Sequence, residues 1–290
     1  MIPAHHSDIL TIEDRNLLDD PQSISHNSPC FHNSASHRLK VSKICIGAHP
    51  TMAPLRRFPL AARASLLVWL GCSVATGLNA DDKATGQLFN GKNLDGWNIF
   101  INHADKTMDP TTDTKGIFKV EDGVIHVSGE EFGCLTTAKD YENYHLKLEF
   151  KWGEKRWKPR ETAKRDSGIL YHCIGKDKVW TKSVECQIQE GDCGDFYMVD
   201  GTSGVVKGKR QPSFSKKLKD TEKPNGEWNT VEVICKGDTV KHIVNGELVA
   251  EATGLSSDKE GKSPLTKGRI LLQSEGAEVF YRNVFLTPLK

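Results

Sequence analysis

From residue 117 to the C-terminus, polar and apolar residues alternate with a period of two, in short runs separated by turn residues. Residues 145–152 (HLKLEFKW) show this pattern most clearly, because their polar and apolar side chains would point to opposite faces of a strand. No segment keeps the 3.6-residue period of a helix for more than about two turns. Many short strands separated by turns predict an all-β sandwich or barrel around a single core.

Turn residues divide this region into strands. Glu121-Asp122-Gly123 and Asn245-Gly246 are typical of tight hairpin turns, since Gly and Asn accept a positive φ. We expect long solvated loops at residues 153–165, which are strongly basic, and at residues 207–226. We expect strands at residues 117–120, 124–128, 145–152, 169–174, 183–189, 230–235, 240–244, 247–249, 269–273 and 278–286.

Composition argues against two broad classes of protein. The 39 Lys and Arg residues nearly balance the 38 Asp and Glu residues, whereas a general nucleic-acid binder needs a clustered basic excess. No apolar run reaches the roughly 18 residues that a membrane-spanning helix needs. With 37% hydrophobic and 27% charged residues, the chain has the composition of an ordinary soluble folded protein.

The first 80 residues differ from the rest and predict two segments ahead of the folded domain. Residues 1–51 hold six of the 11 His, scattered among Ser, Asn and Pro, and we interpret them as a wrongly assigned upstream extension. The alternative is a disordered, His-rich tail. Residues 52–80 carry Arg56 and Arg57, then an apolar stretch and small residues, which is the pattern of a secretory signal. The working domain is then residues 81–290, in the periplasm or secreted.

The cysteines raise two further questions. Cys72, in the sequence WLGCS, is either removed with the signal or is the lipid anchor of a lipoprotein. Five cysteines follow it, and in an oxidising compartment they could form two disulfides, with Cys186 near both Cys173 and Cys193 in sequence. The alternative is that they are buried thiols. No C-x-x-C pair supports a zinc site, and we expect no cofactor.

Residues 183–190 (SVECQIQE) contain the most informative pattern for function. On a strand, Glu185, Gln187 and Gln189 share one face, while the two residues between them, Cys186 and Ile188, point to the other. Such a polar row can line a groove, whereas the alternative is the solvated outer face of an antiparallel sheet. If neighbouring polar faces coincide, one proton-transferring cluster forms from Glu149, Lys151, His172, Glu185 and Gln187.

Aromatic residues add flat apolar surfaces of the kind that sugar-binding grooves use. We expect Trp180 and Tyr197 to serve such a groove, together with Trp152 and Trp157. Most buried Trp side chains are core residues instead, and we assign Trp97 and Trp228 to the core.

Seven short motifs follow one another along residues 86–289: LFNGKNLDGW (88–97), DSGI (166–169), ECQI (185–188), GEWN (226–229), VNG (244–246), LQ (272–273) and YRNV (281–284). Together and in this order they resemble the 3-keto-disaccharide hydrolase family, long known as a domain of unknown function. The resemblance implies a concanavalin A-like jelly-roll sandwich of two antiparallel sheets with a concave carbohydrate groove, in an exported protein. The family commonly has Asn where Asp166 stands and Arg where His172 stands.

The resemblance implies cleavage of a glycosidic bond in a sugar already oxidised to a ketone at C3. The residue chemistry then suggests Glu185 or His172 as base, Lys151 or Arg282 as the electrophile for the ketone oxygen, and Glu149 as a further proton carrier. A divalent metal could replace the cationic electrophile, although no ligand set demands one. The expected binders of sugar hydroxyls and rings are Gln187, Tyr197, Trp180, Gln273 and Arg282.

Two other functions remain open at this stage. Glu185-x-Gln187-x-x-Glu190 resembles the E-x-D-x-x-E strand of laminarinase-like retaining glycosidases, in which two carboxyl groups lie about 5–5.5 Å apart. Strict alternation, however, places Glu190 on the face opposite Glu185. A carbohydrate-binding module without catalysis would also suit the sandwich and its aromatic faces, because fold does not fix function.

Overall fold

The computed structural model describes residues 86–290, so the predicted extension, the secretory signal and Cys72 lie outside the described residues. Within this part of the chain there are 17 strands and no helix, and hence no helix that could cross a membrane. The strands are β1 (Trp97–Ile101), β2 (Phe118–Glu121), β3 (Val124–Val127), β4 (Gly133–Thr137), β5 (Tyr141–Glu142), β6 (Tyr144–Arg156), β7 (Asp166–Ile174), β8 (Lys182–Gln189), β9 (Phe196–Val199), β10 (Ser203–Val206), β11 (Lys209–Gln211), β12 (Phe214–Ser215), β13 (Asn229–Lys236), β14 (Thr239–Val244), β15 (Glu247–Ser256), β16 (Lys267–Ser274) and β17 (Ala277–Pro288).

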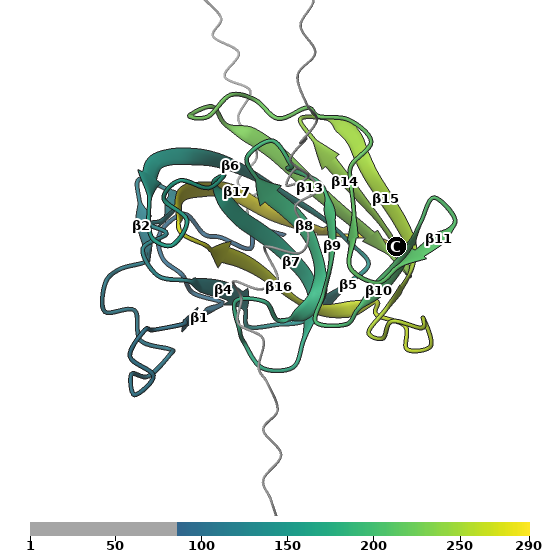
Figure 1. Ribbon diagram of the computed structural model, residues 1–290, viewed down its shortest axis with the longest axis horizontal. Coiled ribbons are helices and arrows are strands. Elements are labelled where there is room, and N and C mark those ends of the chain that lie inside the picture. Colours follow the sequence, from purple (N-terminus) through teal and green to yellow (C-terminus); the bar gives the residue numbers. More distant parts are fainter. Residues whose placement is uncertain (1–85) are drawn as a thin grey trace, which may run out of the picture. The chain divides into compact units, whose positions relative to one another are not determined.

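The strands form two antiparallel sheets that pack against each other (Figure 1). The eight-stranded sheet runs β1-β4-β16-β7-β8-β9-β12, with β5 paired to β16. The nine-stranded sheet runs β11-β10-β15-β14-β13-β6-β17-β3-β2. Strands that are distant in sequence are neighbours in both sheets, so the chain crosses between the layers repeatedly. The prediction of an all-β sandwich of two antiparallel sheets is confirmed.

The inner faces of the two sheets form one apolar core. Leu148, Phe150 and Trp152 of β6 face Ile169 and Tyr171 of β7 within a single cluster of buried side chains. The period-two pattern explains this placement, because alternate residues of each strand point into the sandwich. Trp152 therefore belongs to the core and not to a binding surface. A fully buried large side chain of this kind contributes roughly 1.5–3 kcal/mol to stability.

The sequence pattern locates the long strands and the hairpin β2–β3, but misses most of the other short strands. β2, β3, β6, β7, β8 and β13 to β17 match the predicted strands, with β6 and β15 running several residues further than expected. Strands β9 to β12 have only two to four residues each, so none is long enough to show a period, and β11 and β12 lie inside the predicted loop 207–226.

All five cysteines of the described region are free and buried, so the disulfides considered from the sequence do not form among residues 86–290. Cys134 and Cys173 lie on β4 and β7, which are separated by β16. Burial raises the pKa of the Cys134 thiol to about 12. These side chains act as small apolar residues, which was the alternative interpretation.

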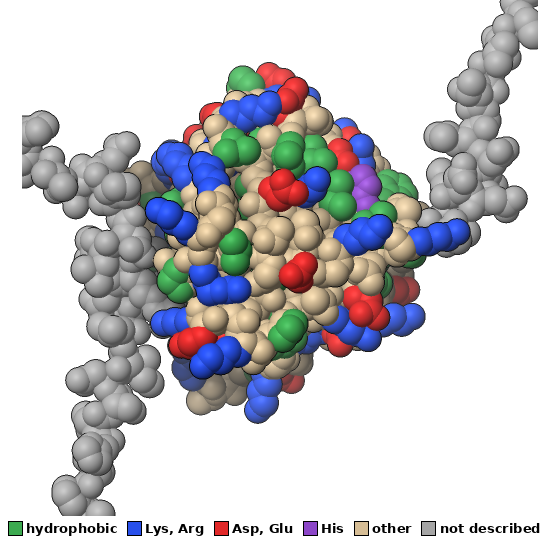
Figure 2. Space-filling model, turned by 90° about the vertical axis from the view of Figure 1, so that its right-hand side faces the viewer, with side chains coloured by type: hydrophobic (Ala, Val, Ile, Leu, Met, Phe, Trp, Pro, Cys, Tyr) green, Lys and Arg blue, Asp and Glu red, His purple; other side chains and the backbone are tan. Residues whose placement is uncertain are grey.

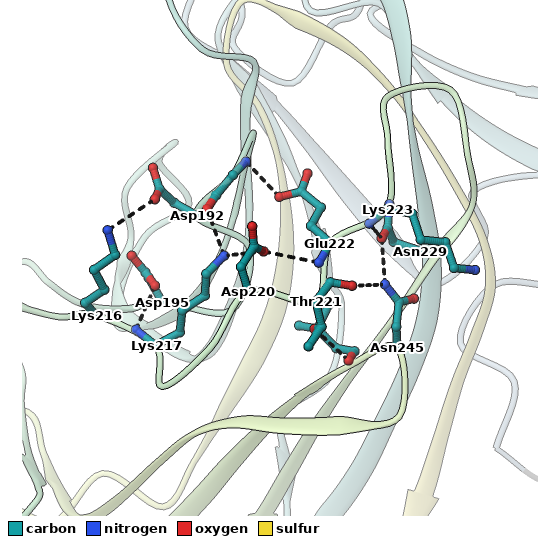
Figure 3. A network of polar contacts seen from close by, with 12 residues as sticks. Asp192, Asp195, Lys216, Lys217, Asp220, Thr221, Glu222, Lys223, Asn229 and Asn245 are labelled. Carbon is teal, nitrogen blue, oxygen red and sulfur yellow. Dashed lines mark hydrogen bonds and ion pairs between the residues drawn. The ribbon is translucent and has the colours of Figure 1, made fainter. Parts of the chain in front are cut away.

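The segment between β12 and β13 passes from one sheet to the other and is fixed by polar contacts (Figure 3). The backbone N–H of Lys217 donates to Asp195 Oδ1 at 2.8 Å, and its buried ammonium donates to Asp220 Oδ1 at 3.0 Å. Further along, Asn245 Nδ2 donates to the carbonyl oxygen of Thr221 at 2.7 Å. Because Asp195 precedes β9 and Asn245 follows β14, these bonds attach the segment to both sheets.

Figure 2 shows one side of the sandwich, turned by 90° from Figure 1. Lys and Arg side chains are interspersed there with Asp, Glu and hydrophobic side chains, without a continuous area of one sign.

Candidate functional site

Glu185 and Gln187 project from β8 on the outer face of the eight-stranded sheet. Alternation places Cys186 and Ile188 in the core and leaves Glu185 and Gln187 on the side away from the nine-stranded sheet. Their side chains are not solvated, since the exposed fractions are 5% and 6%. A polar row that is buried on the outer face of a sheet must be covered by loops, and this distinguishes it from an ordinary solvated face.

Gly168 of β7 provides the space in which two polar side chains meet. A Cβ at this position would lie 2.1 Å from Glu185 Oε1 and 2.1 Å from Gln273 Oε1, so both oxygens lie directly over the glycine. β7 lies between β16, which carries Gln273, and β8, which carries Glu185. Replacement of Gly168, the glycine of the DSGI motif, by any larger residue would push these two side chains apart.

Two more carboxyl groups and one guanidinium complete the cluster. Asp166 begins β7 and forms an ion pair with Arg160 from the loop between β6 and β7. Arg160 Nη1 also lies 3.9 Å from Glu275 Oε2, in the turn after β16. Gln189 Nε2 donates to Asp166 Oδ2 at 2.8 Å. Asp166 and Glu275 thus share a single positive charge, and Glu185 lies beside Asp166.

Burial controls the electrostatics of this cluster. It raises the pKa of Glu185 well above its usual range, and the neighbouring Asp166 raises it further. Burial also raises the pKa of Glu275, with additional repulsion from Asp166 and Glu185. The pKa of Asp166 is raised to about 6, because burial outweighs the opposing effect of Arg160. Desolvated carboxyl groups with overlapping fields cannot all be ionised at once, so the cluster can hold and move protons near neutral pH.

Several buried polar atoms of this cluster lack a partner. Asp166 Oδ1, Arg160 Nε and Gln273 Oε1 are buried and make no hydrogen bond within the described part of the chain. Leaving such a group unpaired costs about 1–3 kcal/mol, so proteins usually avoid it. Three such atoms in one place indicate a site where a ligand or an added proton supplies the missing partners.

Aromatic side chains lie beside the carboxyl groups. The loop at residues 175–181 lies over the sheet and is held by Gln273 Nε2, which donates to the carbonyl oxygen of Val179 at 2.9 Å. From this loop Trp180 lies beside Glu275 and opposes the rise of its pKa. Tyr197 of β9 is paired with Glu185 across the strands and shares its face. Indole and phenol rings beside polar groups suit a sugar ring.

The structure brings together five of the nine residues that the sequence assigned to the site. These are Glu185, Gln187, Gln273, Tyr197 and Trp180, and the assignment of their roles stays a prediction. Arg160, Asp166 and Glu275 were not assigned. Asp166 lies in the DSGI motif and Glu275 follows Gln273 by two residues, which are usable signals, whereas nothing in the basic loop distinguishes Arg160.

Glu149, Lys151 and Arg282 lie elsewhere, so the prediction of a single cluster that includes them is wrong. β6 and β17 belong to the nine-stranded sheet, and these residues project from its outer face, on the far side of the core from Glu185. There Arg282 Nε donates to Glu149 Oε2 at 2.6 Å, and Lys151 Nζ lies 5.1 Å from the centre of the Trp228 ring. Trp228, assigned to the core from the sequence, is half-buried on this outer face.

His172 is also outside the cluster, although it lies on β7. It has a positive φ of 52° at an irregularity in the β7–β8 pairing, which shifts the alternation and turns the ring into the core. Its Nδ1 lies 3.2 Å from the carbonyl oxygen of Leu265, and the ring packs edge-on against Tyr144 and Tyr171. Burial lowers the pKa of His172 to about 4. The prediction that its side chain joins Glu185 is therefore wrong.

Glu190 does not pair with Glu185 either. β8 ends at Gln189, and the Glu190 carboxyl accepts hydrogen bonds from Arg165 and Asn225. The carboxyl pair of a laminarinase-like retaining glycosidase is therefore not formed by these two residues. Among residues 86–290, no group of three or more His, Cys, Asp or Glu side chains is arranged to hold a metal ion.

Comparison with known proteins agrees with this architecture. Residues 84–287 match the family described as "3-keto-alpha-glucoside-1,2-lyase-like domain". No curated protein matches the sequence. The sequence-based resemblance is thus confirmed over most of the chain.

Solved structures with similar folds include two candidate glycosyl hydrolases from Parabacteroides distasonis ATCC 8503. One is 25% identical, covers 73% of this chain and 98% of its own, and has a TM-score of 0.50. The other is 24% identical, covers 70% and 98%, and has a TM-score of 0.48. A β-glucanase from Bacillus licheniformis is 12% identical over 68% and 93%, with a TM-score of 0.39. The fold is the jelly roll of carbohydrate-active, glycosyl hydrolase-like proteins, and the chain belongs to the 3-keto-alpha-glucoside-1,2-lyase-like domain family.

Proposed function

We propose that the protein cleaves the glycosidic bond of a disaccharide, or a related glycoside, whose sugar carries a ketone at C3. Family membership supports this substrate class. The observation that carries the proposal is a buried group of three carboxyls, two of them paired with one guanidinium, beside polar and aromatic side chains on the outer face of the eight-stranded sheet.

The chemistry follows from the ketone. A C3 carbonyl acidifies the hydrogen on C2, so a carboxylate can remove it. The electron pair then expels the C1 substituent, whose oxygen takes a proton from an acid, and a C1–C2 double bond forms. Addition of water to that bond completes a net hydrolysis. The site needs a base, an acid and positive charge near the ketone oxygen.

Residues of the cluster can fill these three roles. Asp166 and Glu185 are the proton-transfer pair, because they are buried close to each other and burial raises the pKa of both carboxyl groups, that of Asp166 to about 6. Arg160 supplies the positive charge, and its Nε is free to donate. These residues replace His172, Lys151, Arg282 and Glu149, which the sequence suggested for the same steps.

The surrounding side chains suit a sugar. Trp180 and Tyr197 offer ring faces, while Gln187 can bond hydroxyl groups. The unpaired Asp166 Oδ1 can also accept a hydrogen bond from a hydroxyl group.

Turnover assays test the proposal. The full chain is offered a 3-keto-disaccharide, the same disaccharide without the ketone, and a β-glucan, and released sugar is followed. We expect cleavage of the keto substrate alone, reduced about 10²–10⁴-fold in Glu185→Gln. Glu149→Gln, which removes a carboxyl from the opposite outer face, should retain the native rate.

Other outcomes would replace the proposal. Cleavage of the β-glucan or of the unoxidised disaccharide would indicate an ordinary glycosidase. Binding of any of the three without cleavage would indicate a carbohydrate-binding module.

We further propose that the protein is exported, because residues 52–80 have the pattern of a secretory signal. Mass spectrometry of the mature N-terminus distinguishes the outcomes. A first residue near Asp81 supports secretion, a lipid on Cys72 supports anchoring, and an intact N-terminus contradicts export.

A further inference from the structure

Glu185 and Gln273 each place an acceptor oxygen over Gly168, with no evident donor between them. Glu185 Oε1 and Gln273 Oε1 both lie within 2.1 Å of the same point above Gly168. The amide of Gln273 cannot be turned round to resolve this, because its Nε2 donates to the carbonyl oxygen of Val179 at 2.9 Å. With the amide reversed, two carbonyl oxygens would face each other. The amide oxygen therefore points at the carboxyl group, and it has no other partner.

We propose that Glu185 keeps its proton at neutral pH and donates it to Gln273 Oε1. A carboxylic acid has one O–H donor, whereas a carboxylate has none, so only the protonated form makes this contact favourable. The proton also satisfies the buried amide oxygen, which otherwise remains unpaired at a cost of about 1–3 kcal/mol.

The other groups around Glu185 favour the neutral acid. Asp166 on the neighbouring strand and Glu275 in the turn after β16 bring negative charge, and Tyr197 on β9 brings a phenol. Arg160, from the loop before β7, is the cation of the cluster and pairs with Asp166 and Glu275.

On the core side, the groups near Glu185 are Tyr171 and Cys186, and both are neutral because burial raises the pKa of each. No described neighbour thus offsets the cost of ionising Glu185, and burial raises its pKa well above the usual range.

The catalytic role of the protonated Glu185 rests on the proposed function. If the protein cleaves a keto substrate, this protonation state sets the direction of proton transfer. Glu185 is the acid that protonates the departing C1 oxygen, and Asp166 is the base that takes the C2 hydrogen. Water addition at C1 then gives its proton to the Glu185 carboxylate, while C2 takes back the proton held by Asp166, so both groups return to their starting states. Gln273 is a positioning residue, because it holds the acid and does not transfer a proton.

Infrared difference spectroscopy of the full chain at pH 7 tests the proton directly. We expect a carbonyl band from a protonated carboxyl group that shifts on exchange into D2O and is lost in Glu185→Gln. Glu149→Gln should keep the band. If the difference between native protein and Glu185→Gln contains carboxylate bands alone, Glu185 is ionised and the inference is wrong.

A second variant keeps the test decisive should Glu185→Gln fold poorly. In Gln273→Ala the protonated acid loses its acceptor, so ionisation of the carboxyl should begin at lower pH than in the native protein. The same titration should be unchanged in Glu149→Gln. An unchanged titration in Gln273→Ala would contradict the contact that we infer.

The infrared spectra test the proton on Glu185 and the turnover assays test the proposed function, so either can be contradicted without the other. A protonated Glu185 in a protein that cleaves no keto substrate would leave the inference standing and remove the proposed function. Turnover of the keto substrate with an ionised Glu185 would do the reverse.

Discussion

The outer faces of the two sheets use similar residues in different ways. On the nine-stranded sheet, charges meet partners across neighbouring strands: Arg282 Nε lies 2.6 Å from Glu149, and His145 Nε2 lies 2.6 Å from Glu232. On the eight-stranded sheet, Asp166 and Glu275 share Arg160, Glu185 has no cationic partner, and buried polar atoms make no hydrogen bond within the described part of the chain.

Aromatic side chains show the same contrast. On the nine-stranded sheet, Trp228 lies 3.8 Å from the Arg282 guanidinium, and Lys151 Nζ lies 5.1 Å from the Trp228 ring and 5.2 Å from the Phe280 ring. These cations and rings satisfy one another. On the eight-stranded sheet, Trp180 and Tyr197 instead border the carboxyl groups.

This difference between the two outer faces indicates how a reactive site on a β-sandwich can be located. A solvated face pairs its charges at little cost, whereas a face covered by loops desolvates them and leaves them incompletely paired. Such unpaired groups persist where a ligand completes them. Sequence alternation gives the two faces the same pattern, so burial and pairing are what separate them.

Removal of Arg160, the cation of the eight-stranded sheet's outer face, should give the largest difference in stability loss between the two outer faces. Arg160→Met leaves Asp166 and Glu275 buried without a counter-charge, and we expect a loss of about 3–5 kcal/mol in the free energy of unfolding at pH 8. Arg282→Met removes a partly exposed partner and should cost about 0–1 kcal/mol. Urea unfolding measures both. Equal losses would contradict the contrast.

The next effect concerns two glycines that each lie beneath a carboxyl group. In Gly168→Ala the new Cβ meets Glu185 and Gln273, and in Gly153→Ala it meets Glu278 at 2.3 Å on the other sheet. Overpacking of this kind costs about 1–3 kcal/mol, so both variants should lose stability. Cleavage of the keto substrate should fall in Gly168→Ala alone. An equal fall in both would show that the activity follows stability and not the position of Glu185.

The sequence predicts the long strands and the row at residues 185–187, because both depend on alternation within one strand. It does not predict which strands, each with its own row of polar side chains, lie next to one another in the folded protein. Glu149 and Glu185 each sit on an alternating strand, yet one strand enters each sheet, and strand order depends on pairing between distant segments. His172 shows a local limit, since an irregularity in the pairing reverses its orientation without a sequence signal.

Arg160 and Glu275 were not predicted from the sequence, because alternation says nothing about residues outside strands. Both lie outside strands, in a loop and a turn, where no periodicity assigns a side chain to a face. Their positions depend on how the connections fold back over the sheet. The resemblance to a known family supplied the motif around Asp166, but without coordinates that motif could not be linked to Arg160.

The difference in the free energy of unfolding between Glu185→Gln and the native protein should depend on pH. Because the folded-state pKa of Glu185 lies above its unfolded value, the stabilisation that it gives is complete below about pH 4.3 and is lost as the pH rises. Relative to native protein, the variant should therefore gain stability from pH 5 to pH 8, by at most about 1.4 kcal/mol per pH unit. Gln187→Leu, which removes no titratable group, provides the control. A pH-independent difference for Glu185→Gln would contradict the raised pKa.

The smallest effect is expected for a charge pair on the nine-stranded sheet. Glu232 Oε2 lies 2.6 Å from His145 Nε2, and Oε1 lies 3.3 Å from Lys147 Nζ, with Lys147 largely exposed. Glu232→Gln should lower the free energy of unfolding by about 0.2–1 kcal/mol, and the loss should shrink in 1 M salt because the Debye length falls to about 3 Å. Urea unfolding at low and high salt measures this. A salt-independent loss of several kcal/mol would mean that this face also holds desolvated charge, and the contrast with the eight-stranded sheet would no longer locate the site.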